Sequence, residues 1–173
     1  MALIDMETAL SSFPSCSSSS SSSSSTGQWK YDVFISFRGK DTRNTFVDLL
    51  YDAFKREGII AFKDDEKLEK GKTISQELSN AIEKSRYAVV IFSKNYVSST
   101  WCLNELVKIV QCEKEKIYPV FYDVEPSYVR KQEGTFEHDF IEHEKNFNED
   151  RVKMWRVALS QVGEIVGWPV INR

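Results

Sequence analysis

A tryptophan and a glutamate stand four residues apart in the stretch SSTWCLNEL, at Trp101 and Glu105. Four residues bring two side chains to neighbouring turns of one helical face, so we expect the indole beside the carboxylate. The hydroxyl side chains that precede Trp101 can cap the start of this helix. An exposed acid next to an aromatic ring is a candidate binding or catalytic site.

The apolar residues of the same stretch predict which helical face turns toward the core. Four of them recur at helical spacing: Leu103, Leu106, Val107 and Val110. Trp101 and Glu105 fall on the opposite face, so we expect both at the surface. The plain alternative is a solvated glutamate beside a tryptophan packed under a loop, which is the usual state of an exposed helical glutamate.

Short apolar runs alternate with helical patterns from residue 31 onward. The runs predict strands at 31–37, 59–62, 87–92, 117–122 and 168–171, and Pro119 favours an outer strand for the fourth run. Helical spacing predicts helices over 46–54 and 152–162 and after Trp101. A further helix is predicted through Leu78, Ala81 and Ile82, where Thr73 with Gln76 matches a capping box that opens it. Strands separated by helices predict an α/β fold with a doubly wound sheet of five parallel strands.

The predicted fold gives the Trp101 helix a position beside a binding crevice. Ligands of doubly wound sheets bind at the carboxyl ends of the strands, where the strand order reverses, and the loops 37–45 and 93–101 border that point. Arg38 and Arg43 come from the first loop. Two cations, an acid and an aromatic wall suit a phosphate-bearing ligand with a flat ring, which favours a functional Glu105 over a solvated one.

Other ligand sites are poorly supported. Gly39 stands alone after the first strand, so the G-x-G-x-x-G pattern of dinucleotide-dependent hydride transfer is absent. The third strand is followed by Ser93 and not by the phosphate-accepting aspartate of response regulators. His138 and His143 are five residues apart without clear partners, so we expect surface or packing residues and no metal site. Cys102 is expected as a packed thiol.

Composition restricts the class of protein. The 173 residues include 41% hydrophobic side chains, enough for one domain with a sizeable core. The formal net charge is −3 with both signs mixed along the chain, so we predict no nucleic acid and no membrane surface as partner. Three widely spaced cysteines indicate a reducing compartment, and no apolar run has membrane-spanning length. We expect a cytoplasmic protein, with the nucleus as an additional location.

Two polar segments flank predicted elements. Residues 11–26 are dominated by serine, with nine in a row at 17–25, so we predict a disordered leader over 1–28 and one domain over 29–173. The charged run 63–72 is predicted as a solvated loop, and its place beside the crevice makes a lid or docking surface the alternative.

Four motifs resemble one known family. They are YDVFISFRGKDTR at 31–43, DD followed by LEKG within 64–71, WCLNEL at 101–106 and FYDVEPS at 121–127. Together they resemble the Toll/interleukin-1 receptor (TIR) domain of plant immune receptors, over about residues 29–171. The resemblance implies a flavodoxin-like fold and an enzyme that cleaves the nicotinamide–ribose bond of NAD+, which is the substrate and not a cofactor. It also implies linear or cyclic ADP-ribose signals and assembly with other TIR domains.

The resemblance assigns roles to particular residues. Glu105 takes the place of the catalytic glutamate, Trp101 lines the site, and Ile74 matches a further contact position. Nine residues of the first loop match the segment that contacts the dinucleotide: Phe37, Arg38, Gly39, Lys40, Asp41, Thr42, Arg43, Asn44 and Thr45.

Two departures from the family pattern concern its pairing surface. Asp48-Leu49 replaces the Ser-His or Asp-His pair of many relatives, and the sequence stops at Arg173, before the last helix of the family. We therefore expect partial exposure near Leu49 and Phe54 and weakened self-association. The runner-up is a non-catalytic adaptor that acts by TIR–TIR contact, but the intact Glu105 favours the enzyme.

Overall fold

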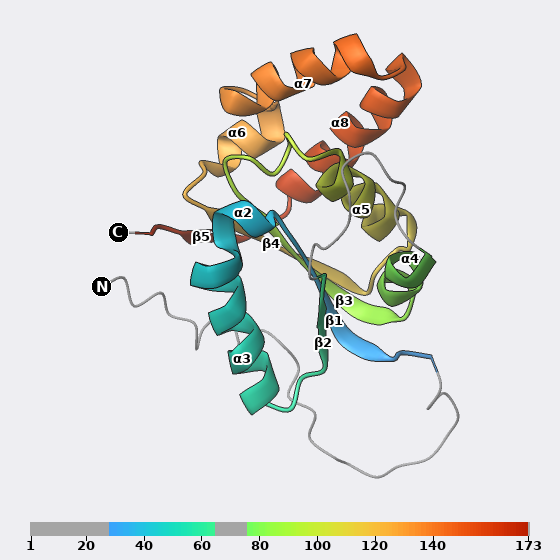
Figure 1. Cartoon of the computed structure of the whole chain (residues 1–173), viewed down its shortest axis with the longest axis vertical. Coiled ribbons are helices and arrows are strands. Elements are labelled where there is room, and N and C mark those ends of the chain that lie inside the picture. Colours follow the sequence, from blue (N-terminus) through green and yellow to red (C-terminus); the bar gives the residue numbers. More distant parts are fainter. Residues whose placement is uncertain (1–27, 65–75, 173) are drawn as a thin grey trace.

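Five parallel strands form one sheet in the order β2-β1-β3-β4-β5, as Figure 1 shows. The computed structural model describes residues 28–64 and 76–172 of the chain. The strands are β1 (Tyr31–Phe37), β2 (Ala61–Lys63), β3 (Ser85–Phe92), β4 (Lys116–Tyr122) and β5 (Trp168–Val170). Every neighbouring pair is parallel, which confirms the predicted doubly wound sheet. The strand order reverses between β1 and β3, where the crevice was expected.

Helices cover both faces of this sheet (Figure 1). In chain order they are α2 (Gly39–Thr42), the π-helix η1 (Arg43–Val47), α3 (Asp48–Arg56), α4 (Gln76–Glu83), α5 (Thr100–Gln111), α6 (Pro126–Lys131), α7 (Thr135–Asn146) and α8 (Glu149–Gly163). Phe54 of α3 packs with Val33 and Ile35 in one apolar cluster. Leu103 of α5 packs with Phe34 in the other, because successive residues of a strand point to opposite faces.

The last residues of β1 continue this alternation into the predicted crevice. Ser36 lies two residues beyond Phe34, so it points to the face that α5 covers, whereas Phe37 belongs to the cluster on the α3 face. The end of β1 therefore presents a hydroxyl to one layer of helices and an aromatic ring to the other.

Two sheet predictions are wrong in detail. The second strand begins at Ala61. Ile60 is 59% exposed, and its N–H donates to the Asp32 carboxylate and not to a strand carbonyl, although its own carbonyl accepts from the N–H groups of Asp32 and Val33. Pro119 does not lie in an outer strand, since β4 runs between β3 and β5. The proline is tolerated because β5 pairs with β4 only from Val120 onward.

Helices α6 and α7 were not predicted, although the sequence carries signals for both. Pro126 occupies the first turn of α6, where a proline suits a helix start. Phe136, Phe140 and His143 are the buried residues of α7 and follow helical spacing. Thr73 and the charged run beyond Asp64 lie outside the described residues, so the capping box and the loop remain predictions.

The apolar edge of α3 is less exposed than expected. Leu49 is 60% exposed, but Phe54 is fully buried. Within the described ranges no helix combines the length and apolar character that crossing a membrane requires. The same residues contain no group of three or more His, Cys, Asp or Glu side chains that could hold a metal ion.

Candidate active site

Glu105 is buried, contrary to the surface position that the helical pattern predicted. Its side chain is 2% exposed and lies on the sheet side of α5 together with Leu106 and Ile109. The helix start is as expected, because the Ser99 hydroxyl accepts a hydrogen bond from the backbone N–H of Cys102 over 3.3 Å. The carboxylate is therefore held in the interior, beside the end of β1.

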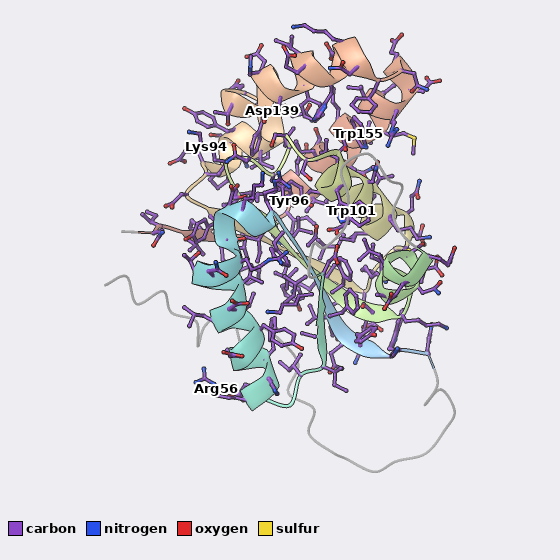
Figure 2. The ribbon with its side chains drawn as sticks, in the orientation of Figure 1. Arg56, Lys94, Tyr96, Trp101, Asp139 and Trp155 are labelled. Atoms are coloured by element: carbon purple, nitrogen blue, oxygen red, sulfur yellow. The ribbon has the colours of Figure 1, made fainter. Side chains whose placement is uncertain are left out.

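Two hydroxyl groups connect Glu105 to the sheet. The Ser36 hydroxyl donates to Glu105 Oε2 over 2.7 Å, and the Tyr96 hydroxyl lies 2.8 Å from Ser36 Oγ. Tyr96, labelled in Figure 2, follows β3 and is fully buried. Burial raises the pKa of Tyr96 well above its usual value, and Cys102 and Glu105 act in the same direction, so the phenol keeps its proton.

Trp101 and Arg43 meet at the end of β2. The indole Nε1 of Trp101 donates to a carboxylate oxygen of Asp64 over 3.1 Å, and Arg43 Nη2 donates to the Asp64 carbonyl over 3.4 Å. Trp101 is half-buried at the start of α5 (Figure 2). Asp64 thereby joins the first loop to α5. The sequence placed Asp64 beside the crevice but gave it no role.

Asp41 joins the two loops that border the crevice. Its carboxylate accepts a hydrogen bond from the Ser93 hydroxyl over 2.6 Å and two from Asn95, through the backbone N–H and the side-chain amide, each over 3.0 Å. The carboxylate therefore accepts three hydrogen bonds from two residues. These bonds link the segment after β1 to the segment after β3.

The rest of the first loop is anchored at several points. The Arg43 guanidinium lies 5.5 Å from the ring centre of Phe37, and the hydroxyls of Thr45 and Tyr122 are 3.2 Å apart. Gly39 opens the short α2 helix after half-buried Arg38, whose carbonyl accepts a hydrogen bond from the buried Thr42 hydroxyl. Lys40 and Asn44 are exposed, and Ile74 lies outside the described residues. A π-helix such as η1 is rare and occurs often at functional sites.

Cys102 and His143 are both packing residues in the structure. Cys102 is fully buried and its thiol lies 3.5 Å from the Phe37 carbonyl, so it is a packed thiol. His143 is 8% exposed, and its Nε2 lies 2.8 Å from the Val97 carbonyl against the ring of Trp155.

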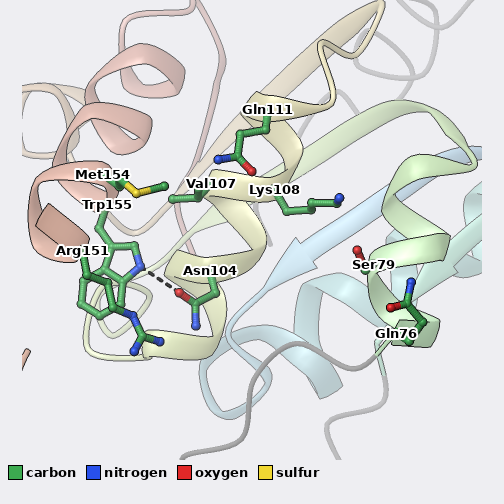
Figure 3. A pocket seen from close by; sticks show the side chains of 9 residues that line it. All are labelled: Gln76, Ser79, Asn104, Val107, Lys108, Gln111, Arg151, Met154 and Trp155. Carbon is green, nitrogen blue, oxygen red and sulfur yellow. Dashed lines mark hydrogen bonds between the residues drawn. The ribbon is translucent and has the colours of Figure 1, made fainter.

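A separate cavity of about 360 Å³ lies between α4, α5 and α8, and Figure 3 shows its lining side chains. Asn104 and Trp155 form part of this wall, and the Trp155 indole donates to Asn104 Oδ1 over 2.9 Å. This bond ties α8 to the residue next to Glu105. The buried Glu105 carboxylate is not among the lining residues.

The fold and this site define a TIR domain. Residues 30–172 match the TIR domain family, and the chain belongs to that family. It is 49% identical over 148 residues to TMV resistance protein N of Nicotiana glutinosa, across 83% of this chain and 13% of that protein. It is 50% identical over 146 residues to disease resistance protein RUN1 of Vitis rotundifolia, across 81% of this chain and 11% of that protein.

A solved structure confirms the fold. The structure of the activated Roq1 resistosome, which directly recognizes the pathogen effector XopQ, contains TIR domains that are 53% identical to this chain with a TM-score of 0.74. The match covers 80% of this chain and 87% of that one. The chain spans 11 to 13% of the length of the two resistance proteins above.

Proposed function

We propose that this TIR domain is an NAD+ nucleosidase that cleaves the nicotinamide–ribose bond and makes ADP-ribose-derived signals in plant innate immunity. The observation that carries the proposal is the Glu105 carboxylate, which is 2% exposed and held by Ser36 at the switch point of the sheet. The motif resemblance and the similarity to plant resistance proteins support the same reaction.

The chemistry requires one well-placed anion. As the bond breaks, its electron pair goes to the pyridinium nitrogen, nicotinamide leaves as a neutral molecule, and positive charge develops on the ribose. A carboxylate removed from water stabilises that charge more strongly than a solvated one does. Water then attacks the ribose carbon, and its proton passes to Glu105 and on to solvent. Attack by an adenine nitrogen in place of water gives a cyclic product.

The surrounding residues supply binding groups for the dinucleotide. Arg38 directly follows β1, Arg43 begins η1, and both are cations suited to its phosphates. Trp101 is the aromatic wall for a flat ring, oriented by its bond to Asp64. Other TIR domains are the partners that we propose for this chain, because the Roq1 TIR domains were solved in a resistosome.

The sharpest test replaces Glu105 with glutamine. We expect Glu105→Gln to lower nicotinamide release from NAD+ at least about 100-fold, because a preorganised charge at a developing ion contributes on this scale. The amide oxygen can still accept from Ser36, so the melting temperature should stay close to that of the parent. Alanine is a poorer choice, since Glu105 is buried and its truncation would leave a cavity and remove the carboxylate that accepts from Ser36.

Glu115→Gln is the matched control. Glu115 is exposed, follows α5 and pairs with Arg86 at the surface, so this variant should turn over NAD+ like the parent. Parental turnover in Glu105→Gln would contradict the assignment of Glu105. A parent that releases no nicotinamide at high protein concentration would instead favour the adaptor function.

A further inference from the structure

Three contacts form a continuous hydrogen-bonded chain behind Glu105. Ser36 Oγ lies 2.7 Å from Glu105 Oε2 and 2.8 Å from the Tyr96 hydroxyl, which in turn lies 3.2 Å from the backbone carbonyl of Cys102. Ser36, Tyr96 and Cys102 are each fully buried. This hydrogen-bonded chain connects the end of β1, the loop after β3 and the first turn of α5.

The hydrogens available to these contacts depend on the charge of Glu105. Each hydroxyl donates one hydrogen and can accept others. When Glu105 is ionised, Ser36 donates to the carboxylate and Tyr96 donates to Ser36, so the two hydrogens run toward the charge. When Glu105 is protonated, it donates to Ser36, Ser36 donates to Tyr96, and Tyr96 donates to the Cys102 carbonyl.

The direction of donation along these hydrogen bonds can therefore reverse without moving a heavy atom. All three contacts carry a hydrogen in the protonated state, and the charge-assisted bond from Ser36 is kept in the ionised state. Burial raises the pKa of Tyr96, so the phenol does not lose its own proton to the chain. Such networks hold a side chain in one place because every member stays satisfied.

We propose that Ser36 and Tyr96 are positioning residues that hold Glu105 in one geometry before and after it takes up a proton during turnover. This inference rests on the proposed NAD+ cleavage. Neither residue touches the substrate in this role, and both act through the Glu105 carboxylate. The effect should therefore appear in kcat and not in substrate binding.

The test measures nicotinamide release from NAD+ across substrate concentrations for the full chain and its variants. Ser36→Ala removes the donor to a charged group and should lower kcat about 10-fold to 100-fold. Tyr96→Phe loses one oxygen atom and should lower kcat about threefold to tenfold. Ser36 still donates to the ionised carboxylate in this variant, but when Glu105 is protonated the Ser36 hydrogen loses its acceptor. KM should stay near the parental value in both.

The double variant tests whether both residues act through one chain. Without Ser36 the Tyr96 hydroxyl has no route to Glu105, so Ser36→Ala with Tyr96→Phe should be no slower than Ser36→Ala alone. Ser85→Ala and Tyr118→Phe are the matched controls. Ser85 is buried in β3 and donates to the Ala81 carbonyl, and Tyr118 is buried in the cluster on the α3 face. Both controls should keep the parental kcat.

Each opposing result has its own meaning. If the parent is active and Ser36→Ala keeps the parental kcat, the positioning role alone is overturned. Multiplied losses in the double variant, or an equal loss in Ser85→Ala, overturn it in favour of general loosening of the fold. A parent without nicotinamide release overturns the proposed function and the positioning role together.

Discussion

At the scale of single residues, the Asp41 carboxylate holds together the two segments that border the site. It lies 52 residues from Ser93 in the chain, yet its carboxylate accepts hydrogen bonds from Ser93 and Asn95. We expect Asp41→Ala to lower the free energy of unfolding by about 1 to 2 kcal/mol, because the buried Ser93 hydroxyl loses a charged partner while exposed Asn95 can turn to water. Urea denaturation measures this change.

Lys40→Ala is the control for this prediction. Lys40 is the exposed neighbour of Asp41 in the same short helix, so its truncation should change stability by no more than about 0.5 kcal/mol. If the two alanine variants proved equally stable, the hydrogen bonds that Asp41 accepts would not be what holds the two segments together.

The sequence predicted which residues lie near one another at the end of the sheet more accurately than how deeply they are buried. It placed Trp101 near Glu105 and brought Arg43 to the same site, and the structure shows Trp101 and Arg43 meeting at Asp64. It expected an exposed Glu105 because a helical pattern counts only apolar neighbours. That pattern contains no information on Ser36, whose hydroxyl on a distant strand makes burial of the carboxylate possible.

At the scale of elements, the approach of β5 to β4 depends on a glycine. A Cβ atom at Gly167 would lie 2.2 Å from the Pro119 carbonyl oxygen and 2.8 Å from the Phe121 ring. Backbone must move to relieve the first contact, so Gly167→Ala should cost at least about 2 kcal/mol. Nicotinamide release should fall as well, because the Tyr122 hydroxyl at the end of β4 lies 3.2 Å from that of Thr45 in the site loop.

Val166→Ala separates this contact from a general effect of substitutions in the same turn. Val166 is 92% exposed, and its truncation should leave the midpoint of thermal unfolding nearly unchanged. If the Gly167→Ala and Val166→Ala proteins had the same melting temperature, the close approach of β5 to β4 would not contribute to stability.

The elements that the sequence predicted are those with regular apolar periodicity. The strand around Val33 and the helix around Leu106 are buried on continuous faces, which gives clear patterns. Helices α6 and α7 are mostly exposed, and their few buried residues, such as Val129 and Phe140, are separated by charged ones. Short amphipathic helices of this kind depend on packing against α8, which local sequence does not reveal.

At the scale of the whole molecule, one sheet separates two apolar clusters. Both clusters are built from residues between Tyr31 and Val170, and each includes residues of β1 and β3. Glu105 lies on the side of the sheet that α5 covers, and the Phe37 ring lies on the side that α3 covers. The candidate site therefore forms where the two layers meet at the end of β1, which explains why its residues come from both halves of the chain.

This arrangement predicts where the chain can be shortened from its first residue. Deletion of residues 1–26 should leave the melting temperature and nicotinamide release at parental values, because a serine tract has little apolar surface to bury. Deletion of residues 1–30 should lower the melting temperature. It removes the backbone bond of 2.8 Å from the Lys30 N–H to the Lys84 carbonyl, and the Trp29 ring, whose centre is 5.5 Å from Lys114 Nζ.

The test is the difference in melting temperature between the two deletions. Lys114 is 9% exposed, and its Nζ donates to the carbonyls of Ile82 and Ser85 at the junction of α4 and β3. Burial lowers the pKa of Lys114, and its bonds to the two carbonyls stabilise the buried amino group. Loss of the Trp29 ring exposes this group to water and weakens its hold on the junction. Equal melting temperatures for the two deletions would place the boundary of the folded domain after residue 30, whereas a fall already at residue 26 would place it within the serine tract.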